Sequence, residues 1–146
     1  MGSPVFVWPG HFPVHTVHEV NDMLKAFLAG AAGYPALELL FRRRTHYSMA
    51  VAGGLSAMLI RTLSRTPVHR GVQAVLCGAG ITAIEWGCGQ IWNRDYQVWD
   101  YRRTPLNWRG QVCLPYTLLW CGLSAGMLPI LDQRHRATQK PAGQSR

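Results

Sequence analysis

Two carboxylates within apolar stretches are the residues of this chain whose positions most need a chemical explanation. Glu38 and Glu85 are the only acidic residues inside its long apolar blocks. A carboxylate at the centre of a bilayer costs about 2.5–3.5 kcal/mol, so such a group is usually protonated, paired or turned to a water-filled cavity. Both residues are therefore candidates for a proton or cation site, or for contact with a cationic substrate.

The two carboxylates differ in their neighbours along the chain. Glu38 lies four residues before Arg42, close to the expected end of a helix, so a local ion pair is an equal alternative to a functional role. Glu85 has no charged residue within four positions and is more central in its apolar block. This position favours a functional or inter-helix role for Glu85.

A second group of polar residues lies between the last two apolar blocks, at residues 93–110, with the sequence NRDYQVWDYRRTPLNWRG. Aromatic residues that flank two membrane spans account for much of this composition, and we do not predict nucleic-acid binding. The order of Trp99, Asp100 and Tyr101, followed by Asn107, predicts a structured loop. The acid and the amide of this loop are candidate partners of Glu85 or of an arginine, and we expect Asp100 and Asn107 to form a buried polar knot beneath Trp99.

Four apolar blocks must position these residues, at 24–41, 48–60, 72–92 and 111–131. The last two are long enough to cross the ~30 Å hydrocarbon core at about 1.5 Å per residue, and the first two are shorter. Hydrophobic residues make up 48% of the chain and charged residues 15%, against roughly 25% charged in ordinary soluble domains. No block carries the polar stripe that a soluble bundle needs. The predicted fold is an all-α, integral membrane four-helix bundle with four spans.

The predicted organisation has three parts: an N-terminal tail at 1–22, a four-helix transmembrane domain at 23–132 and a basic, disordered C-terminal tail at 133–146. Each apolar block has two small residues four positions apart, a spacing that lets helix backbones approach closely in lipid. These pairs are Ala26 and Gly30, Ala50 and Gly54, Ala74 and Gly78, and Gly122 and Gly126. Lysines and arginines divide eight to seven between the two sides, so they favour neither orientation.

The sequence lacks the common motifs of hydrolases and of ATP-binding proteins. It contains no GxSxG, HExxH or Walker A motif. Its four cysteines form no CxxC pair and have no zinc-ligand spacing, so we expect them to pack as apolar residues. Enzyme activity is therefore not indicated by any motif, although it stays open as an alternative. We predict no cofactor and no metal site, and any ATP used by the system would be bound by another chain.

Three stretches, at residues 33–55, 84–93 and 98–120, resemble the putative ABC-transporter type IV family of small bacterial membrane proteins described as permease-like. The most specific part is the run WDY, then P-x-N, then G-x-x-C-L-P, at residues 99–115. The resemblance covers roughly residues 26–132. The chain departs from the family at Phe41–Arg44, where a Trp-Arg-Gly turn is usual, and its first 22 residues have no counterpart.

The resemblance implies a multi-pass protein of the bacterial inner membrane and a set of residues that form a binding or structural polar site. Its in-membrane acids correspond to Glu38 and Glu85, and its Arg-x-Thr-His turn places Thr45 and His46 in the site. Its loop motif adds Trp99, Asp100, Tyr101, Pro105, Asn107 and Gly110.

Three functional hypotheses follow. The first is a permease-like component of an ABC transporter with an unidentified substrate, energised by an ATPase chain or an ion gradient. The second is an accessory or scaffold membrane protein without transport activity. The third is a membrane-embedded enzyme that acts on lipid headgroups through Asp100, His46 and Arg103. The expected partners are the lipid bilayer, a second copy of the chain, and an ATPase or other membrane chain, with no nucleic acid.

Overall fold

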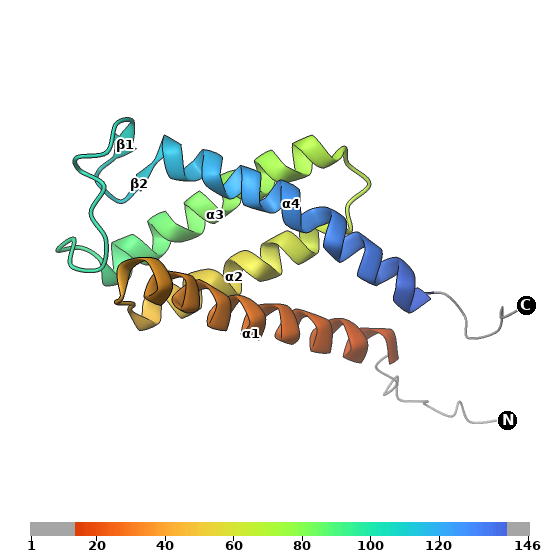
Figure 1. Ribbon diagram of the computed structural model, residues 1–146. Helices are drawn as coiled ribbons and strands as arrows, with labels where there is room; N and C mark the ends of the chain where they lie inside the picture. The colour runs from red at the N-terminus through yellow and green to blue at the C-terminus, as the bar shows by residue number, and fades with distance from the viewer. Residues whose placement is uncertain (1–13, 140–146) are drawn as a thin grey trace, which may run out of the picture.

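The computed structural model describes residues 14–139, which form four helices and one two-stranded hairpin (Figure 1). In chain order the elements are α1 (Val14–Arg42), α2 (Tyr47–Ser64), α3 (Arg70–Trp92), β1 (Asn107–Trp108), β2 (Val112–Cys113) and α4 (Leu114–Gln139). Three of these helices, α1, α3 and α4, are long and apolar enough to cross a membrane. The predicted all-α, four-helix membrane fold is confirmed.

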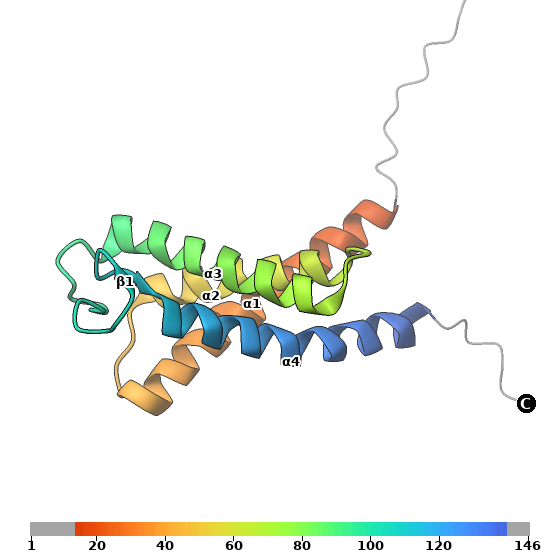
Figure 2. The same cartoon turned by 90° about the horizontal axis from the view of Figure 1, so that it is seen from above.

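The helices run alternately up and down, as Figures 1 and 2 show from two directions. The principal packed pairs are α1 with α2, α2 with α3, and α3 with α4. One end of the bundle holds the start of α1, the α2–α3 connection and the end of α4. The opposite end holds the α1–α2 turn and the long α3–α4 loop.

Glycine lets α1 and α2 approach closely. A Cβ atom on Gly30 would collide with the Gly53 carbonyl, and a Cβ on Gly53 would collide with the Gly30 carbonyl. Gly78 allows the same close approach between α3 and Cys121 of α4. Such contacts stabilise helix pairs in lipid, where burial of apolar surface provides little driving force.

The predicted spacing of small residues is right for three helices and wrong for the fourth. Gly54 of α2 receives the ring of Phe27, so it also serves helix packing. A Cβ atom at Gly122 or Gly126 would meet no atom of another element within 4 Å. Because α4 turns these glycines outward, they do not bring it closer to α3.

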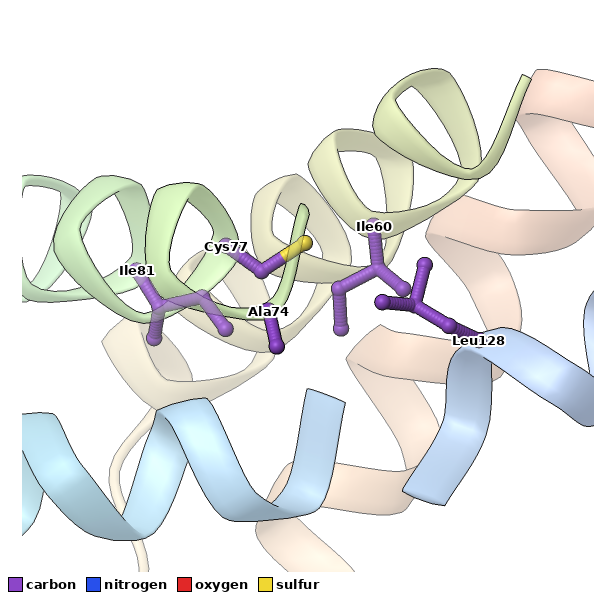
Figure 3. Packing of buried hydrophobic residues seen from close by; sticks show 5 residues of the cluster. All are labelled: Ile60, Ala74, Cys77, Ile81 and Leu128. Atoms are coloured by element: carbon purple, nitrogen blue, oxygen red, sulfur yellow. The ribbon is translucent and has the colours of Figure 1, made fainter. Parts of the chain in front are cut away.

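Two buried clusters hold the bundle together. The first brings α2, α3 and α4 together (Figure 3) and consists of Ile60, Ala74, Cys77, Ile81 and Leu128. The second lies beneath the α3–α4 loop and consists of Met49, Ala52, Cys88 and Trp99. Large apolar side chains also cover the outside of the bundle, where Leu40 is 75% and Phe41 80% exposed. Outward apolar faces of this kind suit contact with lipid chains.

Ion pairs join α1 to α2 at the end of the bundle that holds the start of α1. Asp22 of α1 accepts a hydrogen bond from Arg61 of α2, and Arg65 lies 3.5 Å from Glu19 and 3.4 Å from Asp22. Arg61 is thus paired with a carboxylate of α1, so its charge is neutralised within the bundle.

Parts of both predicted tails are helical. α1 begins at Val14, within the predicted N-terminal tail, and α4 continues to Gln139, within the predicted C-terminal tail. Residues 1–13 and 140–146 of those tails lie outside the described part of the chain. The three-part domain division remains a prediction.

The contact between Gly30 and Gly53 predicts a position-specific effect of side-chain size. Gly30→Leu or Gly53→Leu should destabilise the bundle by ~1–3 kcal/mol, because α1 and α2 must separate to admit the side chain. Gly33→Leu is the matched control, since a Cβ at Gly33 meets nothing within 4 Å and the gain in helix propensity is the same. Thermal unfolding in mild detergent measures all three, and equal melting temperatures would contradict the assigned contact.

Candidate polar site and loop

Glu85 is a buried carboxyl group on α3 where three helices meet. Glu85 is 5% exposed, and its Oε1 accepts a 2.9 Å hydrogen bond from the hydroxyl of Tyr34 on α1. Trp120 of α4 packs against the Tyr34 ring at a centroid distance of 5.5 Å. The side chains of α1 and α4 therefore meet beside the carboxyl group of α3.

The surroundings of Glu85 are mostly apolar. Cys88 belongs to the buried cluster beneath the loop, and Ile84 and Tyr34 pack against that cluster. The indole nitrogen of Trp120 is buried and has no hydrogen-bond partner among residues 14–139. The structure thus groups one carboxyl, one hydroxyl and one indole N–H inside the bundle. Of these groups the carboxyl can hold a proton or contact a cation, whereas the indole N–H is a donor only.

Glu38 lies near the end of α1 and is engaged on both carboxylate oxygens. Oε1 pairs with Arg42 at 3.0 Å, and Oε2 accepts a hydrogen bond from the Thr45 hydroxyl at 2.9 Å. Arg42 also donates to the Val98 carbonyl of the α3–α4 loop at 3.1 Å. Of the two interpretations of Glu38 from the sequence, the local ion pair with Arg42 is the one observed, and it fastens the α1–α2 turn to the loop.

His46 acts as the N-cap of α2. Its Nδ1 accepts a hydrogen bond from the Ser48 N–H at 3.3 Å and lies 2.8 Å from the Ser48 hydroxyl. A capping side chain satisfies one of the free N–H groups at the start of a helix. His46 and Thr45 are thus structural residues of the turn that leads into α2.

The α3–α4 loop is organised around Trp99, which is 5% exposed. Its indole N–H donates to the Gln111 carbonyl at 2.7 Å. Asn93, the C-cap of α3, donates to the Trp99 carbonyl at 2.7 Å and to Gln111 Oε1 at 3.1 Å. Gln111 in turn donates to the Asn93 carbonyl at 2.8 Å, and Asn93 Oδ1 accepts from the Val98 N–H at 2.9 Å.

This network, which we call the amide knot (Asn93, Trp99 and Gln111), corrects the predicted polar knot. The prediction placed Asp100 and Asn107 beneath Trp99, but the buried partners are the two amides at either end of the loop. Both amides stand beside the apolar blocks of α3 and α4 in the sequence, which was the available signal. An amide carries both donors and acceptors, so it can satisfy several backbone groups in a buried place without burying a charge.

Asp100 lies outside the amide knot and is exposed. Its two oxygens accept hydrogen bonds from the Arg102 side chain at 2.7–3.1 Å, and Oδ1 also accepts from the Arg102 N–H at 2.9 Å. The Arg102 guanidinium and this backbone N–H lower the pKa of Asp100 to about 2. The pairing therefore stabilises the loop at neutral pH and is lost as the pH falls towards 2.

Asn107 and Gly110 form the tight turn that joins β1 to β2. Asn107 donates to the Thr104 carbonyl at 2.8 Å and accepts from the Gly110 N–H at 3.0 Å. Gly110 has φ +66°, and a Cβ there would collide with the side chain of Arg102. Glycine suits this position both for its left-handed backbone and for the space that Arg102 occupies.

Tyr101 completes the loop by stacking on Tyr116 of α4 at a centroid distance of 4.8 Å. Of the candidate site residues, Trp99, Tyr101, Asn107 and Gly110 lie in or beside the amide knot and the turn. Glu38, Thr45 and His46 lie together at the α1–α2 turn, which Arg42 joins to the loop. Glu85 forms a separate site within the bundle, and whether any of these residues binds a ligand remains a prediction.

Metal binding finds no support in this arrangement. No group of three or more His, Cys, Asp or Glu side chains in the described part of the chain is placed to hold a metal ion. All four cysteines are free, and three of them are buried. Their positions agree with packing against apolar neighbours.

The helical bundle, its outward apolar faces and its capped loop define a small membrane protein. The sequence profile of the putative ABC-transporter type IV family matches residues 47–141, so the chain belongs to this family. The match begins with α2 and includes Glu85 and the whole α3–α4 loop, whereas Tyr34, Glu38, Thr45 and His46 precede it. No curated protein and no solved structure matches the chain.

The amide knot predicts a stability difference within one loop. Asn93→Ala removes the partner of the Trp99 carbonyl and of the Val98 N–H, and each buried group left unsatisfied costs ~1–3 kcal/mol. Gln111→Ala should have a similar effect. Thermal unfolding in detergent, followed by the near-ultraviolet signal of the tryptophans, measures the change.

Two carboxylates of the same loop serve as controls. Asp95→Ala changes an exposed residue and should leave the melting temperature nearly unchanged. Asp100→Ala should cost less than Asn93→Ala because its ion pair is exposed. A melting temperature for Asn93→Ala that equals that of Asp95→Ala would contradict the importance of the amide knot.

Proposed function

We propose that this protein is a multi-pass membrane subunit of an ABC-type transporter, a permease-like component whose embedded polar site is Glu85. The observation that carries the proposal is the buried carboxyl of α3, held by Tyr34 from α1 and flanked by Trp120 from α4. An ionisable residue inside a membrane bundle is costly and commonly marks a path for ions or substrate. Family membership supports the transporter assignment.

Four spans are part of this proposal, although α2 is not among the three helices that are long and apolar enough to cross a membrane by themselves. α2 has 18 residues and is therefore about 27 Å long, which approaches the thickness of the hydrocarbon core. It packs between α1 and α3, and many of the residues that it buries against them are small, such as Gly53 and Ser56. A helix shielded by its neighbours needs fewer large apolar residues than one that faces lipid.

The proposed subunit works with at least one other chain. The sequence has no ATP-binding motif, so an ATPase partner or an ion gradient must supply energy. Two hollows in the surface are lined by residues such as Gln73 at the α2–α3 connection and Phe27 between α1 and α2, and Glu85 lines neither. A translocation path beside Glu85 would therefore be completed by another copy or by a partner chain.

An accessory or scaffold role is the second candidate, and specific contacts favour it. Glu38, His46, Asp100 and Asn107 all support local structure through ion pairs, a helix cap or a turn. For the proposed headgroup enzyme, Asp100 is engaged by Arg102 and His46 caps α2, so no observation favours that hypothesis. Glu85 is the residue that distinguishes a transport subunit from a scaffold.

Substitution of Glu85 tests the proposal. Glu85→Gln keeps the size and can still accept the Tyr34 hydrogen bond, so the chain should fold and bind its partner. Glu85→Ala leaves the Tyr34 hydroxyl without its acceptor and creates a cavity, so it should destabilise the bundle by ~1–3 kcal/mol. Thermal unfolding and partner recovery from mild detergent measure both effects, with Tyr34→Phe as a control that removes only the donor.

Transport itself separates the two candidate functions. Reconstituted with the co-purified partner in proteoliposomes, a proton-coupled subunit should lose transport or its pH dependence in Glu85→Gln while the complex stays intact. Full activity of this variant at every pH would rule out a proton-carrying role and leave the scaffold. If Glu85→Gln and Glu85→Ala both left transport and the melting temperature unchanged, both roles would be contradicted.

The four-span proposal has its own test. With four spans, residue 2 and residue 146 lie on the same side of the membrane, and reporter fusions at the two ends should agree. Cysteine labelling at these positions is practical because Cys77, Cys88 and Cys113 are buried. Labelling from opposite sides would show that one helix, most simply α2, does not cross.

A further inference from the structure

The end of the bundle that carries the α3–α4 loop has an unusual distribution of charge. The α1–α2 turn and this loop lie side by side there (Figures 1 and 2), joined by the Arg42 hydrogen bond to Val98. The start of α2 and the end of α3 meet beside them through an edge contact between Tyr47 and Trp92. Residues 38–46 and 93–113 contain seven arginines and three carboxylates. The surface therefore has a net positive charge.

Only some of these charges are neutralised within the protein. Glu38 pairs with Arg42, and Asp100 pairs with Arg102. Of the five other arginines, Arg94 donates to the Gln90 carbonyl of α3 at 2.6 Å. The remaining four are exposed and have no carboxylate partner among the described residues. They are Arg43, Arg44, Arg103 and Arg109, which we call the arginine rim. At the opposite end, by contrast, Arg61 and Arg65 are held by carboxylates of α1.

Exposed apolar residues accompany the arginine rim. Leu106 is 73% and Trp108 60% exposed, and both lie on the hairpin between Arg103 and Arg109. The backbone of the hairpin is left-handed at Leu106 and Arg109, with φ values of +53° and +50°. Residues other than glycine keep this conformation only where the surrounding structure holds it. The amide knot and the turn at Asn107 thus hold an apolar tip outward between unpaired cations.

The position of this surface indicates which partner it meets. α3 ends at Trp92 and α4 begins at Leu114, so the loop lies where two candidate spans leave the hydrocarbon core. At that depth the surroundings are phosphate groups with acyl chains just beneath. Arginine binds phosphate through paired N–H donors, and tryptophan is enriched at the same level of the bilayer.

We propose that the arginine rim binds the phosphate groups of anionic phospholipids, with Leu106 and Trp108 inserted between the headgroups. Charge complementarity carries the choice of lipid, since anionic lipids attract basic segments next to a span. The proposal depends on the membrane assignment of α3 and α4 and is independent of transport. A soluble acidic protein that covers the same surface is the competing occupant.

The test compares phosphatidylcholine with phosphatidylglycerol as the added lipid. In detergent, phosphatidylglycerol should raise the melting temperature of the full chain more than phosphatidylcholine does. For Arg103→Gln and Arg109→Gln, the concentration of phosphatidylglycerol that gives half of this stabilisation should rise about fivefold per substitution. Arg65→Gln is the matched control, because it removes one charge that carboxylates already neutralise, and its lipid dependence should match that of the wild type.

A second measurement reports the position of Trp108. In nanodiscs that contain phosphatidylglycerol, brominated acyl chains should quench part of the tryptophan fluorescence, and Trp108→Phe should remove that part. Equal lipid dependence of Arg65→Gln and the arginine-rim variants would overturn the proposal. So would unquenched Trp108 fluorescence, or a co-purified acidic protein whose binding is lost in Arg103→Gln.

Discussion

The hydrogen bond between Tyr34 and Glu85 is the constraint on which the arrangement of the bundle depends. A carboxyl group in apolar surroundings must have a partner, because an unsatisfied polar group there is costly. The partner comes from α1, whereas the principal packing of α1 is against α2. One polar contact thus sets the position of α1 relative to α3, and Trp120 brings α4 to the same place.

The close approach of α1 and α2 follows from the same requirement. Tyr34 can reach α3 only if α1 lies close to α2 where the two helices cross. Gly53 allows this close approach because it has no side chain opposite Gly30. The buried face of α2 is accordingly made largely of small residues, among them Ala52, Gly53, Gly54 and Ser56.

The two ends of the bundle use their charges differently. Near the start of α1, acidic and basic side chains pair and fasten α1 to α2. At the loop end, the buried polar groups are amides that satisfy one another, and several arginines remain outward without a carboxylate among the described residues. This division allows the loop to be rigid without using its cations, which stay available to phosphate groups. The family profile matches Glu85 and this loop but begins after Tyr34. The buried acid therefore lies within the matched residues, and its hydrogen-bond donor lies outside them.

The amino-acid sequence alone determined the all-α membrane fold. Long apolar blocks in lipid must satisfy their backbone N–H and C=O groups internally, and a helix does this within one segment. It also singled out Glu85, since an acid without a charged neighbour is conspicuous in such a block, and it identified the family through the loop motif. Which polar groups meet was decided by the tertiary structure. Tyr34 lies 51 positions from Glu85, and Asn93 lies 18 from Gln111. Contacts over such separations depend on helix register and crossing, which local pattern does not encode, so Asp100 was assigned to a buried knot that two amides form instead.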